Sequence, residues 1–269
     1  MKWLSLSCLA LVGCGGTGDV SLTTWGEEYI EQEIPSTVFE DGYTVRYTKF
    51  LVVIKDFTMA KKTGEKGPVQ ATPFVVDVTR PGPIELQKFS GIDALKYDLV
   101  GYGIGPSPDL VGAGAVAAAD VELMKGNGKS ILVEGTVSKG ALSKRFAWSF
   151  ALDTKYSECT NPDFGEGVTV PTGGSETVQL TIHGDHFWYD DLQSPDAKVR
   201  GSAIVNADSN MDGEVTQSEL AAVQLTSLPI TQYGTGGAGN VKTLADFVSA
   251  LGRTIGHFRG EGECVTSSH

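Results

Sequence analysis

The sequence predicts a mainly β protein, an antiparallel β-sandwich followed by a helical C-terminal segment that carries one metal-binding loop. Two observations support the sandwich. Apolar and polar residues alternate along several short segments, most clearly at 145–152 and 178–183, and such alternation is typical of strands with one buried face. No helical period appears before residue 185, so these segments can pair with one another in a sandwich or barrel.

Further strands are expected at positions 43–57, 74–78, 84–89, 95–104, 116–124 and 130–137, separated by turns at 126–128 and 138–140. Beyond residue 185 the apolar residues of 241–255 form one stripe of a helix, with Asn240 as its expected N-cap. Shorter helical segments are expected at 187–192, 197–207 and 217–225. The chain therefore divides into a sandwich at 25–183 and a helical segment at 184–269.

The first thirteen residues have the features of an export signal. One lysine precedes an apolar run that is too short to span a bilayer. The run ends in Leu11-Val12-Gly13-Cys14, which resembles the lipobox of bacterial lipoproteins. This resemblance implies cleavage before Cys14, acylation of that cysteine and anchoring to a membrane. Lipoproteins of this kind that stay in the inner membrane usually carry an aspartate directly after the acylated cysteine. Gly15 follows Cys14 here, so the resemblance implies an outer-membrane location. The alternative is that the segment is an ordinary secretory signal.

Residues 14–24 are rich in Gly, Ser and Thr and are expected to form a flexible tether. The chain has 33 acidic and 21 basic residues, a formal charge of −12, which argues against a nucleic-acid partner. If Cys8 leaves with the signal and Cys14 is acylated, Cys159 and Cys264 remain. In an oxidising compartment these two should form a disulfide, which on the chain-entropy model stabilises the fold by about 4 to 5 kcal/mol.

The segment from Asp208 to Glu219 matches the pattern of an EF-hand calcium loop at each diagnostic position. It resembles the EF-hand family over twelve loop residues and short flanks, a small part of the chain. The resemblance implies that calcium is bound by Asp208, Asn210, Asp212, the carbonyl of Glu214, a water held by Thr216, and Glu219. Because sensor proteins pair two such loops and this chain has one, we expect a structural ion that holds the helical segment.

Three histidines lie in two short motifs, His183-Gly184-Asp185-His186 after the last clear strand and Gly256-His257-Phe258 after the last helix. If the motifs meet, His183, His186 and His257 could bind copper or zinc, with Asp185 as a ligand or as a partner that orients a ring. The alternative is that they are capping or core-edge residues, with His257 favoured by the negative end of the preceding helix.

The catalytic signals are weak. The sequence has no GxSxG and no HExxH motif, and the glycine-rich run at 234–239 follows no convincing strand, so it is interpreted as a loop. We therefore expect a non-catalytic, calcium-containing lipoprotein that binds a protein or glycan at the cell surface. A copper- or zinc-binding lipoprotein is the alternative, and a hydrolase that uses dispersed carboxylates such as Asp190, Asp191 and Glu166 is a second one.

Overall fold

The protein is mainly β, as the sequence predicts. A computed structural model describes residues 15–229 and 231–268; the segment expected to be a signal peptide, Cys14, Ile230 and His269 lie outside the described residues. The strands are β1 (Thr17–Trp25), β2 (Thr44–Ala60), β3 (Lys66–Val69), β4 (Phe74–Asp77), β5 (Ile84–Asp93), β6 (Lys96–Tyr97), β7 (Leu99–Ile104), β8 (Val111–Gly112), β9 (Ile131–Lys139), β10 (Leu142–Phe150), β11 (Thr154–Ser157), β12 (Thr160–Asn161), β13 (Gly165–Glu166), β14 (Val168–Thr169), β15 (Ser175–Ile182), β16 (Glu214–Val215), β17 (Gly256–Phe258) and β18 (Val265–Ser268).

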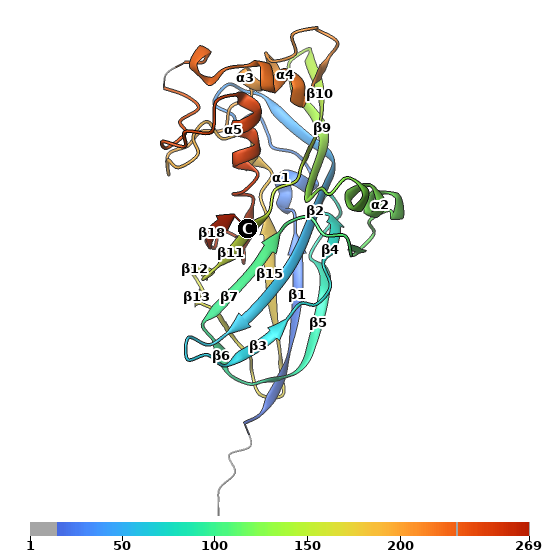
Figure 1. Ribbon diagram of the computed structural model, residues 1–269, viewed down its shortest axis with the longest axis vertical. Helices are drawn as coiled ribbons and strands as arrows, with labels where there is room; N and C mark the ends of the chain where they lie inside the picture. The colour runs from blue at the N-terminus through green and yellow to red at the C-terminus, as the bar shows by residue number, and fades with distance from the viewer. Residues whose placement is uncertain (1–14, 230, 269) are drawn as a thin grey trace, which may run out of the picture.

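The helices are short. They are α1 (Glu27–Glu31), α2 (Ala118–Gly126), α3 (Ser202–Val205), α4 (Gln217–Ala222), α5 (Leu244–Leu251) and the 3-10 turns η1 (Asp185–Trp188) and η2 (Leu225–Ser227). Figure 1 shows the long strands running lengthwise, with α3, α4 and α5 gathered at the end of the molecule opposite the start of β1. Within the described part of the chain, no helix has both the length and the hydrophobicity of a membrane span.

Two sheets form the body. The smaller has the order β17-β15-β1-β5, and the larger runs β16-β10-β9-β2-β7-β11-β18, with β3, β4 and β8 attached through β2 and β4. Most pairs are antiparallel, but β1 and β15 run parallel, from Asp19 opposite Ser175 to Trp25 opposite Thr181. The main core lies where these sheets and the C-terminal helices meet, and it includes fully buried Phe50, Trp148 and Phe247.

The expected tether at 14–24 and the sandwich boundary at residue 25 are wrong, because β1 begins at Thr17. Val20 and Leu22 are completely buried, and the threonines of this strand pair with β15 and β5. The Gly, Ser and Thr composition suggested flexibility. The alternation of buried and partly exposed residues shows that the segment instead gains its stability from pairing on both sides.

The strand expected at 116–124 is helix α2. Its alanine run favours a helix, and Val121 and Met124, three residues apart, pack with Leu51 and Val53 in a second, smaller core. The last helix begins at Leu244 and not after Asn240, because Thr243 and Asp246 form a reciprocal capping box. The other expected helices form, but only over parts of their ranges.

The C-terminal segment does not stand apart from the sandwich. It adds β16 and β18 to the larger sheet and β17 to the smaller one. A disulfide joins Cys159 to Cys264 with an S–S distance of 2.06 Å, which confirms the predicted pairing. Together, the disulfide and β17 hold the end of the chain against β15, the strand that leads into the first histidine motif.

Candidate metal centre

The two histidine motifs meet at the end of β15. Residues His183 and Gly184 leave that strand and enter η1, which contains His186. A side chain at position 184 would place its Cβ 2.6 Å from Ile30 and 2.9 Å from Tyr47, so this tight turn requires glycine. The Tyr47 hydroxyl donates a hydrogen bond of 2.6 Å to the Gly184 carbonyl and fixes the turn.

The third histidine arrives on β17. In the antiparallel pairing of β15 and β17, His257 lies opposite Thr181, and its carbonyl accepts a hydrogen bond of 3.3 Å from the Tyr102 hydroxyl. The His183 and His257 rings have centroids 4.1 Å apart, and the His186 ring lies 5.2 Å and 5.0 Å from them. One ligand nitrogen from each ring lies within 4.8 Å of the other two.

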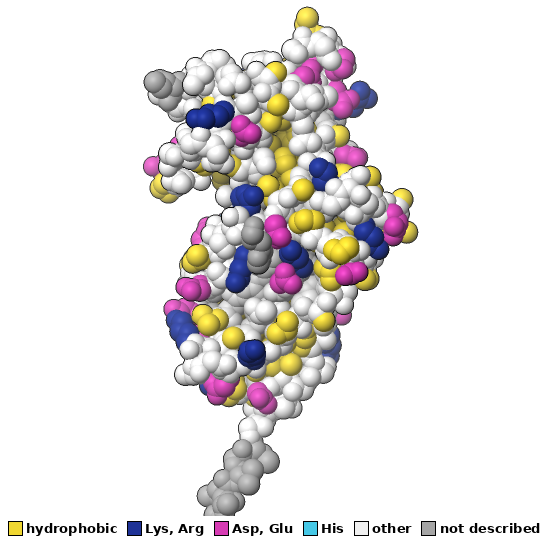
Figure 2. Space-filling model, in the orientation of Figure 1, with side chains coloured by type: hydrophobic (Ala, Val, Ile, Leu, Met, Phe, Trp, Pro, Cys, Tyr) yellow, Lys and Arg dark blue, Asp and Glu magenta, His cyan; other side chains and the backbone are white. Residues whose placement is uncertain are grey.

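All three imidazoles are almost completely buried, with exposed fractions of 5%, 9% and 5% for His183, His186 and His257. Accordingly, Figure 2 shows no imidazole from the described residues on the face that it draws. His183 Nε2 and His257 Nδ1 are buried and have no hydrogen-bond partner among the described residues. Burying a polar atom without a partner costs free energy, so these nitrogens fit a group that accepts their lone pairs.

His186 has its tautomer fixed by a neighbour. Its Nδ1 lies 2.9 Å from the Thr254 hydroxyl oxygen, and the same hydroxyl donates its proton to the Leu251 carbonyl at 2.8 Å. The hydroxyl must therefore accept from His186 Nδ1, which leaves the lone pair on Nε2. This arrangement, in which the outer ring nitrogen is held by a hydrogen bond, is typical of metal-binding histidines.

Burial also sets the charge of the centre. It lowers the pKa of His257 to about 4, with a further contribution from the nearby His183. The pKa of His186 lies well below its ordinary value for the same reason, with His257 and His183 adding to the shift. These two rings are thus neutral at pH 7, which is the form that binds a metal.

Carboxylates surround the imidazoles. Asp185 is buried, which raises its pKa, and one of its oxygens accepts a hydrogen bond of 3.0 Å from the Tyr189 hydroxyl. It does not belong to the three-histidine group. Glu27, from the start of α1, lies 3.3 Å from His183 Nε2 and forms a second group with His183 and the exposed Glu261. No pattern in the sequence indicates that Glu27 or Glu261 lies here, so neither was predicted as a site residue.

A surface pocket of about 340 Å³ reaches the centre from one side. Its lining includes His186, His257, Tyr189 and Glu263, together with the disulfide-bonded Cys264. The pocket gives ions in solution access to two of the three imidazoles.

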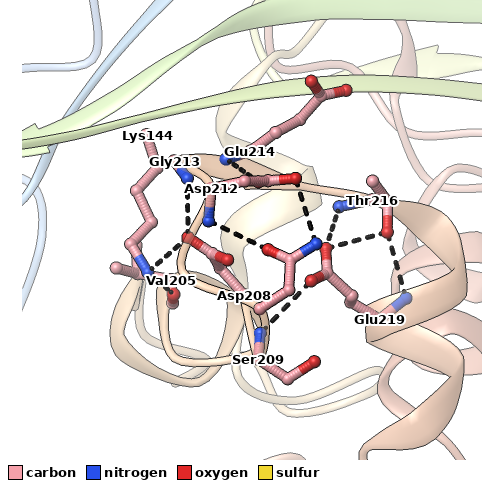
Figure 3. Close-up of polar contacts among 10 residues, drawn as sticks. Lys144, Val205, Asp208, Ser209, Asp212, Gly213, Glu214, Thr216 and Glu219 are labelled. Carbon is pink, nitrogen blue, oxygen red and sulfur yellow. Dashed lines mark hydrogen bonds and ion pairs between the residues drawn. The ribbon is translucent and has the colours of Figure 1, made fainter.

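The predicted calcium loop lies at the helical end of the molecule, between α3 and α4. Backbone amides of the loop donate hydrogen bonds to side chains of the same loop. The Asn210 side chain accepts from the Asp212 amide, Asp212 from the Glu214 amide, and Asp208 from the Gly213 amide. Glu219 accepts from the amides of Ser209 and Thr216 (Figure 3). The side chains of this segment thus point into the loop.

Two features of this loop bear on cation binding. One oxygen of Asp208 contacts the Lys144 ammonium at 3.0 Å, whereas the other is buried and has no hydrogen-bond partner in the described chain. Within the loop, Glu214 and Val215 form β16, which pairs with Arg145 and Phe146 of β10. The loop is therefore attached directly to the larger sheet.

The carboxylates considered for hydrolysis are engaged elsewhere. Asp190 pairs with Arg200, Asp191 accepts from the amides of Gln193 and Ser194, and the exposed Glu166 pairs with Lys62. Each of these carboxylates therefore has a partner that accounts for its position without a catalytic role.

Comparison with known proteins identifies no family. No family model and no curated protein matches the chain. Among solved structures, it is similar to "MbnP from Methylosinus trichosporium", with 10% identity over 63% of this chain and 76% of that one, at a TM-score of 0.39. Similarity at this level carries no functional argument, so the case for function depends on the geometry of the chain itself.

Proposed function

We propose that this protein binds one transition-metal ion through His183, His186 and His257. The observation that carries the proposal is the convergence of three buried imidazoles from two distant motifs, with ligand nitrogens within 4.8 Å of one another. The energetic argument points the same way, since two of the three imidazoles each have a buried nitrogen without a hydrogen-bond partner among the described residues.

The ligand chemistry favours copper or zinc. Imidazole nitrogens bind zinc and copper well, whereas calcium and magnesium prefer oxygen ligands. His186 and His257, whose pKa values are lowered by burial, do not have to lose protons before binding at pH 7. The adjacent pocket at His186 and His257 offers a route for the ion. The sandwich serves as a rigid support, because both motifs are attached to paired strands.

The test is metal content after exposure to copper or zinc and removal of loosely bound ions. We expect about one equivalent per chain in the wild type, and a loss of at least tenfold in affinity for His183→Ala and for His257→Ala, since each removes a ligand. His269→Ala is the matched control, because His269 belongs to neither motif. Unchanged stoichiometry and affinity in the double variant His183→Ala/His257→Ala would refute the proposal.

We also propose that the loop from Asp208 to Glu219 binds a structural calcium ion. The supporting observation is the buried, unpartnered oxygen of Asp208 in a loop whose side chains follow the EF-hand pattern. Through β16, an ion bound there would stabilise the junction between the helical end and β10. The Lys144 ammonium beside Asp208 competes for the same carboxylate and should reduce calcium affinity.

The export signal supports a third proposal, that the protein is a lipoprotein tethered to an outer membrane through Cys14. Its disulfide fits an oxidising compartment outside the cytoplasm. Cys14→Ser should move the protein from the membrane fraction to the soluble fraction of bacterial cells. Retention of this variant in the membrane would contradict the lipid anchor.

A further inference from the structure

Glu27 occupies an unusual position beside the three histidines. It follows Gly26, whose Cα lies so close to Val78 that an added Cβ would be 2.2 Å from the Val78 carbonyl oxygen. Glu27 itself has a positive φ of 56°, a conformation that costs a residue other than glycine about 1 kcal/mol or more. This backbone geometry turns the chain out of β1 and into α1 at the histidine cluster.

The distance between Glu27 and His183 has the value expected for two ligands of one ion. Glu27 Oε1 lies 3.3 Å from His183 Nε2. Metal–ligand bonds of about 2.1 Å at tetrahedral angles place neighbouring ligand atoms about 3.4 Å apart. The nitrogen involved is the buried Nε2, which has no hydrogen-bond partner among the described residues. Glu27 groups with His183 but not with His186 or His257 at ligand-atom distances within 4.8 Å, so its side chain has to turn toward an ion that all three imidazoles bind.

Charge gives an independent argument. The Glu27 side chain is 18% exposed, and among the described residues its only ion-pair contact is His183. A largely buried carboxylate needs a positive partner, but no lysine or arginine in the described chain pairs with it. A divalent cation held by the three imidazoles supplies that charge, and the carboxylate in turn neutralises half of the charge of the ion.

We infer that Glu27 is the fourth protein ligand of the ion bound by His183, His186 and His257, and that its carboxylate selects divalent ions over monovalent copper. This inference rests on the proposed metal-binding function. Anionic oxygen is a hard ligand that favours Zn²⁺ and Cu²⁺, whereas Cu⁺ gains little from it. Glu261, the third member of the Glu27 group, is exposed and lies outside the buried ligand set.

The first experiment compares Glu27→Gln with Glu28→Gln, a matched change at the exposed neighbouring position. Dissociation constants for Zn²⁺, Cu²⁺ and Cu⁺ are measured by competition with chelators of known affinity. For Glu27→Gln we expect 10- to 100-fold weaker binding of Zn²⁺ and Cu²⁺ and less than about threefold change for Cu⁺. Glu28→Gln should bind all three ions as the wild type does.

A second variant separates ligation from simple attraction and guards against misfolding. Glu27→Asp keeps the charge but withdraws the carboxylate by one methylene, so it should also weaken Zn²⁺ binding and change the visible spectrum of the Co²⁺-loaded protein. Wild-type Zn²⁺ affinity and Co²⁺ spectra in both Glu27 variants would overturn the inference. If His183→Ala still lost the metal in that case, the three-histidine centre would stand; if it retained the metal, the proposed function would fail as well.

Discussion

The three imidazoles of the candidate centre differ in what holds each ring. Thr254 fixes the tautomer of His186 through a hydrogen bond to Nδ1. The backbone of His257 is held by strand pairing and by Tyr102. His183 follows the last residue of β15, and its amide donates to the Ile255 carbonyl at 2.9 Å. The backbone positions His183 and His257, and a single side-chain hydrogen bond orients His186, so removing one imidazole should weaken metal binding without unfolding the protein.

The lowered pKa values of His257 and His186 predict an acid sensitivity of the metal-free protein. His257 has a pKa of about 4 in the folded state, compared with about 6.5 in an unfolded chain. Between these values the unfolded state binds more protons, so stability is full above about pH 6.5 and decreases as the pH falls toward about 4. His186 adds to this effect. The buried carboxyl groups of Asp185 and Glu27, whose pKa values are raised, act in the opposite direction.

The measurement is the melting temperature of chelator-treated protein from pH 7.5 to 4.5, with His257→Gln as the comparison. Because glutamine carries no titrating group, the variant should lose less stability over this interval than the wild type does. Identical pH dependence in the two proteins would show that His257 does not titrate as its burial indicates.

At the residue scale the sequence identified three of the four ligands proposed here. The histidines stood out because they are few and lie in two short motifs, although their meeting in space depended on the pairing of β15 with β17. Glu27 could not be found in this way. It is one of 33 acidic residues, and its place in the centre comes from the contact of Gly26 with Val78 and from a positive φ, neither of which leaves a pattern in a single sequence.

At the scale of elements, alternation predicted the strands well because one face of each is buried. It failed at α2, where local helix propensity and a small second core prevail, and at β1, where burial between two neighbouring strands overrides a composition typical of linkers. The helical segments were overestimated in length. Val241 and Ile255 fit the predicted helical stripe but lie outside α5, and both are buried in the main core.

The calcium loop provides a prediction at this scale. Glu219 would supply two oxygens to the ion, whereas Glu214 would contribute only its carbonyl. Glu219→Gln should therefore abolish the increase in melting temperature that calcium gives the wild type, and Glu214→Gln should retain it. Glu219 also accepts hydrogen bonds in the capping box of α4, so the variant should be less stable in chelator too. A calcium-dependent increase equal to that of the wild type in Glu219→Gln would show that the loop is assigned wrongly.

At the scale of the whole molecule, the C-terminal segment completes the centre from far along the chain. It supplies His257 through β17, and the Cys159–Cys264 disulfide fixes the residues that follow. The sequence indicated the disulfide, because Cys159 and Cys264 remain once Cys8 and Cys14 are assigned to the signal and the lipid anchor. The disulfide in turn indicated that the C-terminal segment lies against the middle of the chain. It could not indicate the parallel pairing of β1 with β15, which brings Glu27 and His183 together at the ends of neighbouring strands.

The most direct test of the account is anomalous X-ray diffraction from crystals of the mature protein loaded with zinc or copper, recorded on either side of the absorption edge of the metal. We predict one strong anomalous peak bonded to His183, His186 and His257, with the Glu27 carboxylate as a fourth ligand. A peak elsewhere in the molecule, with the three imidazoles not bound to metal, would contradict the central claim.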